Sequence, residues 1–208
     1  LRLRRGSSNL MQSSTKRLFD IVLAVALLIL LSPLLLLIAA LVYIDSPGKP
    51  IFRQARTGYH GRRFLMFKFR TMVPNAEELK AKLAHLNVLQ PPDFKIPNDP
   101  RITRVGRFLR KTSLDELPQL LNILQGDMSF VGPRPTSFKP ETYSPWHGER
   151  LEVKPGLTGL WQVEGRGSME FDERLRLDIW YLRNWSLWLD LKLLWLTAIS
   201  VLRRRGAY

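Results

Sequence analysis

The chain has 208 residues, which is enough for one domain with its own hydrophobic core. It carries 32 lysines and arginines against 18 acidic residues, a net charge of +14, so its expected partners are polyanions such as anionic lipid, phosphorylated substrates or nucleic acid. The absence of cysteine excludes disulfides, thiolate metal sites and a cysteine nucleophile, and the three scattered histidines exclude a histidine-based metal motif.

The first element is apolar and long enough to cross a membrane. Residues 1–15 are polar and basic and are expected to form an arm, whereas residues 21–44 are almost all apolar. Ser32-Pro33 stands at the middle of this run, and proline inside a helix favours a kink. Basic residues flank both ends, and such residues mark the cytoplasmic side of membrane helices. The pattern favours a re-entrant helix over residues 16–45, kinked at Ser32-Pro33; a straight transmembrane helix is the alternative.

The remaining chain, residues 46–208, is expected to form a domain on the cytoplasmic face of the membrane. Periodicity and turn residues predict two strands within 50–70 joined by a turn at 57–61, helices at 75–90, 101–111 and 114–125, a strand at 156–164 and a helix at 169–183. The predicted fold class is α+β, mainly helical and membrane-associated, with a re-entrant membrane helix, a small β-hairpin and interfacial amphipathic helices.

A helix at residues 185–202 is predicted to lie on the membrane surface. Trp185, Trp188 and Trp195 are spaced to share one helical face, and three arginines follow the helix. Tryptophan is enriched at headgroup depth, and a basic end binds anionic lipid. The alternative is a helix buried in a protein core. Asp178 and Tyr181, on the preceding predicted helix, share a face that suits either a site or a core.

The acid pair Asp115-Glu116 is the strongest candidate for chemistry. With Ser113 the pair matches a capping box, which would make it structural. The acids are, however, surrounded by basic residues, and Arg134 is held in a rigid turn between two prolines. Carboxylates are hard oxygen ligands for Mg²⁺, and one of the two could instead attack phosphorus. The cations predicted to bind substrate phosphates are Lys68, Arg70, Arg110, Arg134 and Arg166.

Several motifs together resemble those of the bacterial sugar transferases, the monotopic phosphoglycosyl transferases that initiate exopolysaccharide, O-antigen or capsule assembly. They are Lys16-Arg17-Leu18-Phe19-Asp20, Lys68-Phe69-Arg70-Thr71-Met72, residues 110–119, Gly126-Asp127-Met128-Ser129, residues 131–135 and residues 155–163. The resemblance extends from Lys16 to Tyr208. This segment is similar to the catalytic C-terminal part of a larger family member, such as an undecaprenyl-phosphate sugar-1-phosphate transferase.

The resemblance implies transfer of a sugar-1-phosphate from a UDP-sugar to undecaprenyl phosphate, with release of UMP. On this basis Asp115 would be the nucleophile of a ping-pong reaction with a covalent aspartyl-phosphosugar intermediate, and Glu116 would help Asp115 to hold Mg²⁺. Lys68, Arg110 and Arg134 would steady phosphates. The family also implies a re-entrant helix broken at Ser32-Pro33, and a monotopic protein on the cytoplasmic face of the bacterial inner membrane.

Two other readings use the same residues. A membrane-bound, Mg²⁺-dependent hydrolase of nucleotide sugars or lipid diphosphates would transfer the phosphoryl group to water. A non-catalytic basic module would bind a membrane surface; binding to nucleic acid is not expected, because the clustered acids would repel its phosphates. Membrane lipid, UDP-sugar and undecaprenyl phosphate are the expected partners, and a homodimer is an alternative to a monomer.

Overall fold

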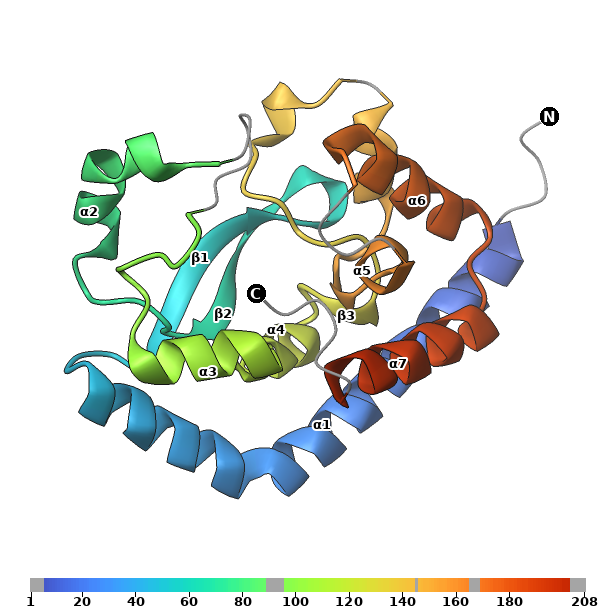
Figure 1. The fold of residues 1–208 in the computed structure, drawn as a ribbon. Coiled ribbons are helices and arrows are strands. Elements are labelled where there is room, and N and C mark those ends of the chain that lie inside the picture. Colours follow the sequence, from blue (N-terminus) through green and yellow to red (C-terminus); the bar gives the residue numbers. More distant parts are fainter. Residues whose placement is uncertain (1–5, 89–95, 145, 165–168, 203–208) are drawn as a thin grey trace.

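The apolar run at residues 21–44 lies within helix α1 (Gly6–Asp45), which runs along one side of the molecule in the computed structural model (Figure 1). The structure describes residues 6–88, 96–144, 146–164 and 169–202. The helix is continuous through Pro33, and Figure 1 shows that it bends near the middle of its length. Proline removes one backbone hydrogen bond of the helix at its own position, which accounts for a bend without a break.

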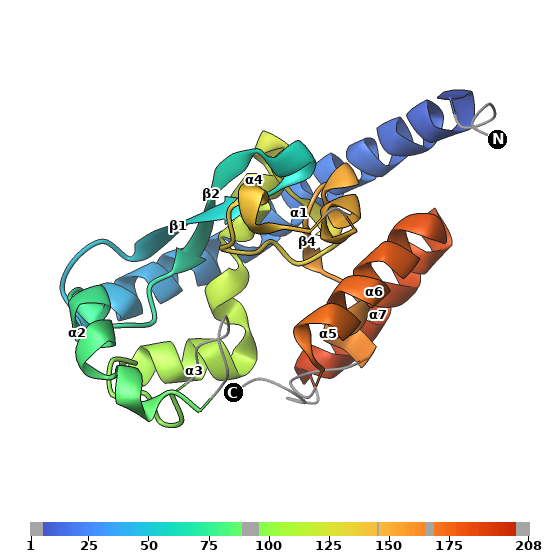
Figure 2. The same ribbon diagram turned by 90° about the horizontal axis from the view of Figure 1, so that it is seen from above.

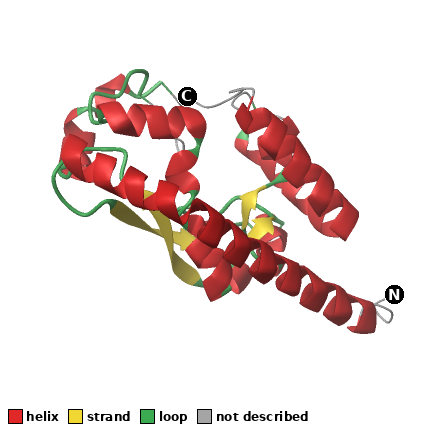
Figure 3. Cartoon of the chain, turned by 90° about the horizontal axis from the view of Figure 1, so that it is seen from below, coloured by secondary structure: helices red, strands yellow, loops and turns green. Residues whose placement is uncertain are grey.

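The prediction of a polar arm over residues 1–15 is wrong for residues 6–15, which form the first turns of α1. Extending an existing helix is much easier than starting one, and no proline stands between Gly6 and Ser32. The stable apolar helix therefore continues backward into polar sequence. Figures 2 and 3 show this N-terminal end of α1 extending beyond the rest of the chain. Residues 1–5 lie outside the described part of the chain.

Helix α1 presents a large apolar surface to its surroundings. Among the described residues, Ser14–Asp45 is long and apolar enough to cross a membrane, and 11% of its most apolar window is buried inside the fold. A core helix of a water-soluble protein would be mostly buried. The inner face of α1 packs against the domain through Ala24 in one apolar cluster and through Ile38 and Val42 in another. The apolar surface of α1 that remains exposed suggests membrane association.

The predicted hairpin is confirmed. Strands β1 (Ile51–Thr57) and β2 (Arg63–Phe69) are antiparallel and joined by η1 (Tyr59–Gly61), with Phe52 opposite Lys68 and Arg56 opposite Phe64. Helix α4 (Gln119–Gln125) binds β2 through the buried Asn122. Its Nδ2 donates to the Leu65 carbonyl at 2.8 Å, and its Oδ1 accepts from the Phe67 N–H at 2.9 Å. The side chain thus replaces a neighbouring strand and fixes the position of β2.

The other elements include the predicted helices and strand with shifted boundaries, together with a short strand at Ser129–Val131 and 3-10 turns at Pro140–Thr142 and His147–Glu152 that were not predicted. They are α2 (Ala76–Lys82), η2 (Ala84–Leu86), α3 (Arg104–Thr112), η3 (Leu114–Glu116), β3 (Ser129–Val131), η4 (Pro140–Thr142), η5 (His147–Glu152), β4 (Gly156–Thr158), α5 (Leu160–Glu164), α6 (Phe171–Arg183) and α7 (Leu187–Leu202). The predicted strand at 156–164 is strand only in β4, which pairs with β3 in parallel, and it continues as α5. The predicted helix at 75–90 is divided between α2 and η2.

Helix α7 combines both alternatives considered for residues 185–202. Leu193 is in the core, whereas Trp188 and Trp195 are 77% and 67% exposed. The prediction that Trp185 shares their face is wrong, because α7 begins after it. Its indole N–H donates instead to Asp190 at 3.1 Å. Asp190 is buried and also accepts from Lys16 of α1 and from the Tyr181 hydroxyl, so this network ties α1 to the domain.

Candidate active site

The acid pair lies in the 3-10 turn η3 rather than at the start of an α-helix. Pro118 has no N–H, and its ring would clash with the Leu114 carbonyl if an α-helix ran through the pair. The turn is therefore closed by hydrogen bonds from residue i to residue i−3, and α4 begins after Pro118. Ser113 has a left-handed backbone (φ 58°) and makes no side-chain cap, so the predicted capping box is wrong. The pair is consequently available for another role.

Glu116 is held between two cations that come from distant segments. Lys68 of β2 donates to Glu116 Oε1 at 2.7 Å, and Arg134 donates to the same oxygen at 2.7 Å. Burial alone would raise the pKa of Glu116, but the charges and hydrogen bonds of Arg134 and Lys68 outweigh burial and hold that pKa well below its usual range. Glu116 is therefore ionised throughout the physiological pH range.

Asp115 is in a different environment although it is the adjacent residue. It is 9% exposed, and no described residue donates a hydrogen bond to its carboxylate. Burial raises its pKa above the usual value, and Lys68 is the strongest of the cations that oppose this rise. A carboxylate without hydrogen-bond donors retains its lone pairs for a reaction, and the nearby cations favour its ionised form.

Arg110 lies at the end of α3 beside the acid pair, as predicted. Its Nε donates to Thr71 Oγ1 at 2.9 Å, which fixes the guanidinium on the segment after β2. Burial lowers the pKa of Arg110, while the charge of Asp115 favours its charged form. An arginine this basic remains charged in proteins, so Arg110 adds a fixed positive charge next to Asp115.

Of the predicted phosphate-binding residues, Arg70 makes its hydrogen bonds away from the acid pair. Arg70 donates to the backbone carbonyls of Ser46 and Pro47, in the segment that follows α1. The reason is that β2 ends at Phe69, so the alternation that places Lys68 on one face does not continue to Arg70. Arg166 lies outside the described residues.

Arg56 belongs to the site but was not predicted there. Its burial and the charge of Arg134 lower its pKa to about 10, and the charge of Glu116 opposes that change. Arg56 donates to Gln54 Oε1 at 2.6 Å on the same strand. The hairpin register would have identified it, because side chains on one face recur at every second residue and Arg56 shares a face with Phe52, opposite Lys68.

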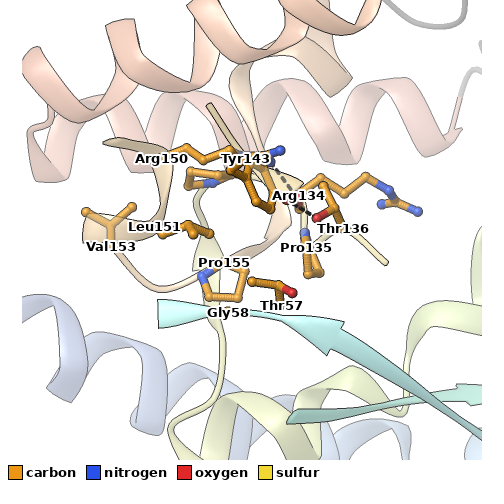
Figure 4. A pocket seen from close by; sticks show the side chains of 11 residues that line it. Thr57, Gly58, Arg134, Pro135, Thr136, Tyr143, Arg150, Leu151, Val153 and Pro155 are labelled. Atoms are coloured by element: carbon orange, nitrogen blue, oxygen red, sulfur yellow. Dashed lines mark hydrogen bonds between the residues drawn. The ribbon is translucent and has the colours of Figure 1, made fainter. Parts of the chain in front are cut away.

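The loop that carries Arg134 forms one wall of a small pocket beside the hairpin. Figure 4 shows Arg134, Pro135 and Thr136 in this wall, facing Tyr143 and Arg150 from the segment that follows. The Thr136 carbonyl accepts from the N–H of Thr57, the last residue of β1, at 2.9 Å. The Pro-Arg-Pro turn is thus attached to the same hairpin that supplies Lys68 and Arg56.

Asp115 and Glu116 are the residues of this site that could hold a magnesium ion. No group of three or more histidine, cysteine or acidic side chains with metal-site spacing occurs in the described part of the chain. Mg²⁺ is commonly held by one or two carboxylates together with substrate phosphates rather than by a full protein cage. Two adjacent carboxylates with Lys68 and Arg134 beside them would suit that mode.

Comparison with known proteins identifies the family of the chain. The model of the family described as bacterial sugar transferase matches residues 11–204. The chain is 50% identical to an undecaprenyl-phosphate galactose phosphotransferase of Salmonella typhimurium, covering 99% of this chain and 45% of the relative. It is 45% identical to a UDP-galactose-lipid carrier transferase of Erwinia amylovora, with 98% and 44% covered. It is 44% identical to a UDP-glucose:undecaprenyl-phosphate glucose-1-phosphate transferase of Caulobacter vibrioides, with 93% and 72% covered.

The chain spans less than half the length of the Salmonella and Erwinia relatives and about three quarters of the Caulobacter one. The family match nevertheless contains the acid pair, the hairpin with Lys68, and the Pro-Arg-Pro turn. On the extent of this match and the identity to its relatives, the chain belongs to the bacterial sugar transferase family.

Proposed function

We propose that the protein transfers a sugar-1-phosphate from a UDP-sugar to undecaprenyl phosphate and releases UMP. The observation that carries the proposal is the contrast within the acid pair. Asp115 is buried and accepts no hydrogen bond from a described residue, while Glu116 is fixed by Lys68 and Arg134. The names of the relatives support this substrate class. Because these relatives are named for galactose and glucose transfer, UDP-galactose and UDP-glucose are the first donors to test.

The reaction proceeds in two displacements on the same phosphorus atom. A carboxylate oxygen of Asp115 attacks the phosphorus that bears the sugar, and the bond from that phosphorus to the bridging oxygen of UMP breaks, so UMP leaves with the electron pair. An oxygen of undecaprenyl phosphate then attacks the aspartyl-phosphosugar at phosphorus. The Asp115 carboxylate is released and the lipid diphosphate sugar is formed. This order gives ping-pong kinetics.

The cations of the site offset the charges that oppose these steps. Donor and acceptor are both anions, and Lys68, Arg110, Arg134 and Arg56 lie around the carboxylates. Mg²⁺ held by Asp115 and Glu116 would neutralise phosphate oxygens and stabilise the leaving group. Glu116 positions Lys68 and Arg134 in the free protein and exchanges these contacts when the substrate phosphates bind.

The exposed apolar surface of α1 supports a proposal for how the protein lies in the membrane. We propose that α1 enters and leaves the bilayer on its cytoplasmic face, with the bend near Pro33 at the deepest point. The exposed Trp188 and Trp195 of α7 would lie at headgroup depth. The phosphate of a polyprenyl carrier is found at this depth, so the acceptor can reach Asp115 without leaving the membrane.

The test is UMP release from a panel of UDP-sugars with Mg²⁺, with and without undecaprenyl phosphate, for the wild type and for Asp115→Asn. We expect one equivalent of UMP without the lipid, multiple turnovers with it, and neither with Asp115→Asn or with EDTA. Radiolabel from the sugar should stay on the wild-type protein until the lipid is added. Sustained release without lipid would favour the hydrolase, and full activity of Asp115→Asn would refute the mechanism.

A further inference from the structure

A buried ion pair joins η5 to α6 behind the Pro-Arg-Pro turn. Arg150 of η5 and Asp178 of α6 are 5% and 2% exposed, and Arg150 Nη2 lies 2.7 Å from Asp178 Oδ2. The same Nη2 atom donates to the backbone carbonyl of Arg134 at 2.6 Å. A chain of contacts therefore leads from Asp178 through Arg150 to the residue whose guanidinium binds Glu116.

The stability of the fold does not require this pair to be ionic. Burying two charges is costly, and an apolar pair of similar size often gives equal or greater stability. The two elements are also joined on the surface, where Arg183 of α6 binds Glu149 of η5 at 2.9 Å. The buried pair differs from the surface pair in one respect that bears on the site: its arginine, Arg150, also donates a hydrogen bond to the Arg134 carbonyl.

The opposite side of the Arg134 loop is fixed by the hairpin. Thr57 donates its N–H to the Thr136 carbonyl at 2.9 Å and its hydroxyl to the Phe138 carbonyl. Arg150 holds the loop on the Arg134 side of these bonds. The backbone at Arg134 is thereby held from both directions, which limits the positions that its guanidinium can reach. A charged donor to a carbonyl is stronger than a neutral one, so an arginine suits this task.

We propose that Arg150 and Asp178 are positioning residues that hold Arg134 where its guanidinium binds the diphosphate of the donor. Asp178 fixes Arg150, and Arg150 fixes the Arg134 backbone; neither touches the substrate. The inference rests on the proposed function, in which Arg134 binds substrate phosphate. Without the pair, the loop keeps its attachment to the hairpin, but Arg134 samples orientations that do not bind phosphate.

The test is a double-mutant cycle between Asp178→Asn and Arg134→Ala, with kcat/KM for the best UDP-sugar and Kd for UMP as separate measurements. We expect Asp178→Asn to lower kcat/KM at least about tenfold in the wild-type background, and less than about twofold when Arg134 is already alanine. Glu149→Gln, which breaks the exposed pair between the same two elements, is the matched control and should leave both quantities unchanged.

Equal losses in both backgrounds would overturn the proposal, because a general structural effect does not depend on Arg134. No loss in the wild-type background would also overturn it. If Asp178→Asn unfolds below the assay temperature, Arg150→Lys takes its place in the cycle with the same thresholds. Lysine keeps the charge but lacks the rigid, planar guanidinium whose Nη2 atom reaches both Asp178 and the Arg134 carbonyl. If the wild type releases no UMP from any donor, the proposed function fails, and the cycle is decided on UMP binding alone.

Discussion

Gly106 of α3 packs directly on the backbone of the segment that follows β2. Its replacement by alanine has two opposing effects on stability: a gain in helix propensity and a steric clash. A Cβ at this position would lie 2.1 Å from the Thr71 carbonyl oxygen and 2.7 Å from the Thr71 Cα, where ordinary contact begins at 3.4 Å. The obstructing atoms are backbone, so they cannot rotate away. Gly106→Ala therefore requires α3 and residue 71 to move apart by about 1 Å.

The sizes of these effects predict whether Gly106→Ala raises or lowers the free energy of unfolding. Alanine is a better helix former than glycine by about 1 kcal/mol, which would raise stability. Overpacking costs about 1–3 kcal/mol. The movement also stretches the bond from the Thr103 N–H to the Thr71 carbonyl at 3.1 Å and the bond from Arg110 to the Thr71 hydroxyl at 2.9 Å, each worth about 1 kcal/mol. We expect a net loss of about 2 kcal/mol, or about 4–8 °C in Tm for a chain of this size.

The assay is thermal unfolding of the detergent-solubilised full chain, followed by tryptophan fluorescence, together with UMP release. Because Arg110 lies beside Asp115, Gly106→Ala should also lower activity below the unfolding temperature. Gly148→Ala is the matched control: nothing lies within 4 Å of its added Cβ, so its Tm should stay the same or rise slightly. A Gly106→Ala protein as stable and active as Gly148→Ala would refute the reasoning.

Three further perturbations test the charges and the buried network. Burial raises the pKa of Asp178 from its usual 3.8 to about 6, so the native state binds this proton more tightly and the free energy of unfolding falls as pH rises through that range. Asp178→Asn should remove about 3 kcal/mol of pH dependence, seen as a smaller difference in Tm between pH 4 and pH 7 than in the wild type. Tyr181→Phe removes the hydroxyl that binds Asp190 at 2.6 Å and should cost about 1.5–3 kcal/mol, measured as a lower Tm with unchanged kcat. Glu116→Gln frees Lys68 and Arg134 for phosphate, so UMP in EDTA should bind roughly tenfold more tightly while turnover is nearly lost; weaker binding than in the wild type would contradict this.

Local patterns predicted much of the fold. The hairpin, α3 and α6 follow from strand alternation, turn glycines and helical spacing, all of which act over a few residues. The errors arise where a single residue changes the local geometry. Pro118 makes the acid pair a 3-10 turn, and the end of β2 at Phe69 turns Arg70 away from the face of Lys68. Pro118 can be read from the sequence, although the periodic pattern outweighs it, whereas the end of β2 is known only from the structure.

Contacts between distant segments could not be predicted in the same way. Arg150 is sixteen residues from Arg134 and twenty-eight from Asp178, and no period relates the three positions. Their contact depends on how η5 is packed against α6, which is a property of the assembled core. Asp190 has the same character, because its burial depends on Lys16 of α1 and on Tyr181 of α6, which bind its carboxylate.

The division of roles within the acid pair depends on such distant contacts. Asp115 and Glu116 are adjacent and chemically equivalent in the sequence, so either could be the nucleophile. Lys68 and Arg134 approach the pair from two other parts of the chain, and both bind Glu116. A carboxylate with two charged donors is a weak nucleophile because its electrons are already shared, whereas Asp115 has no donor among the described residues. The same two cations are within the electrostatic range of Asp115 and keep its ionised form accessible. This contrast supports the proposal that Asp115 attacks phosphorus and that Glu116 holds the cations.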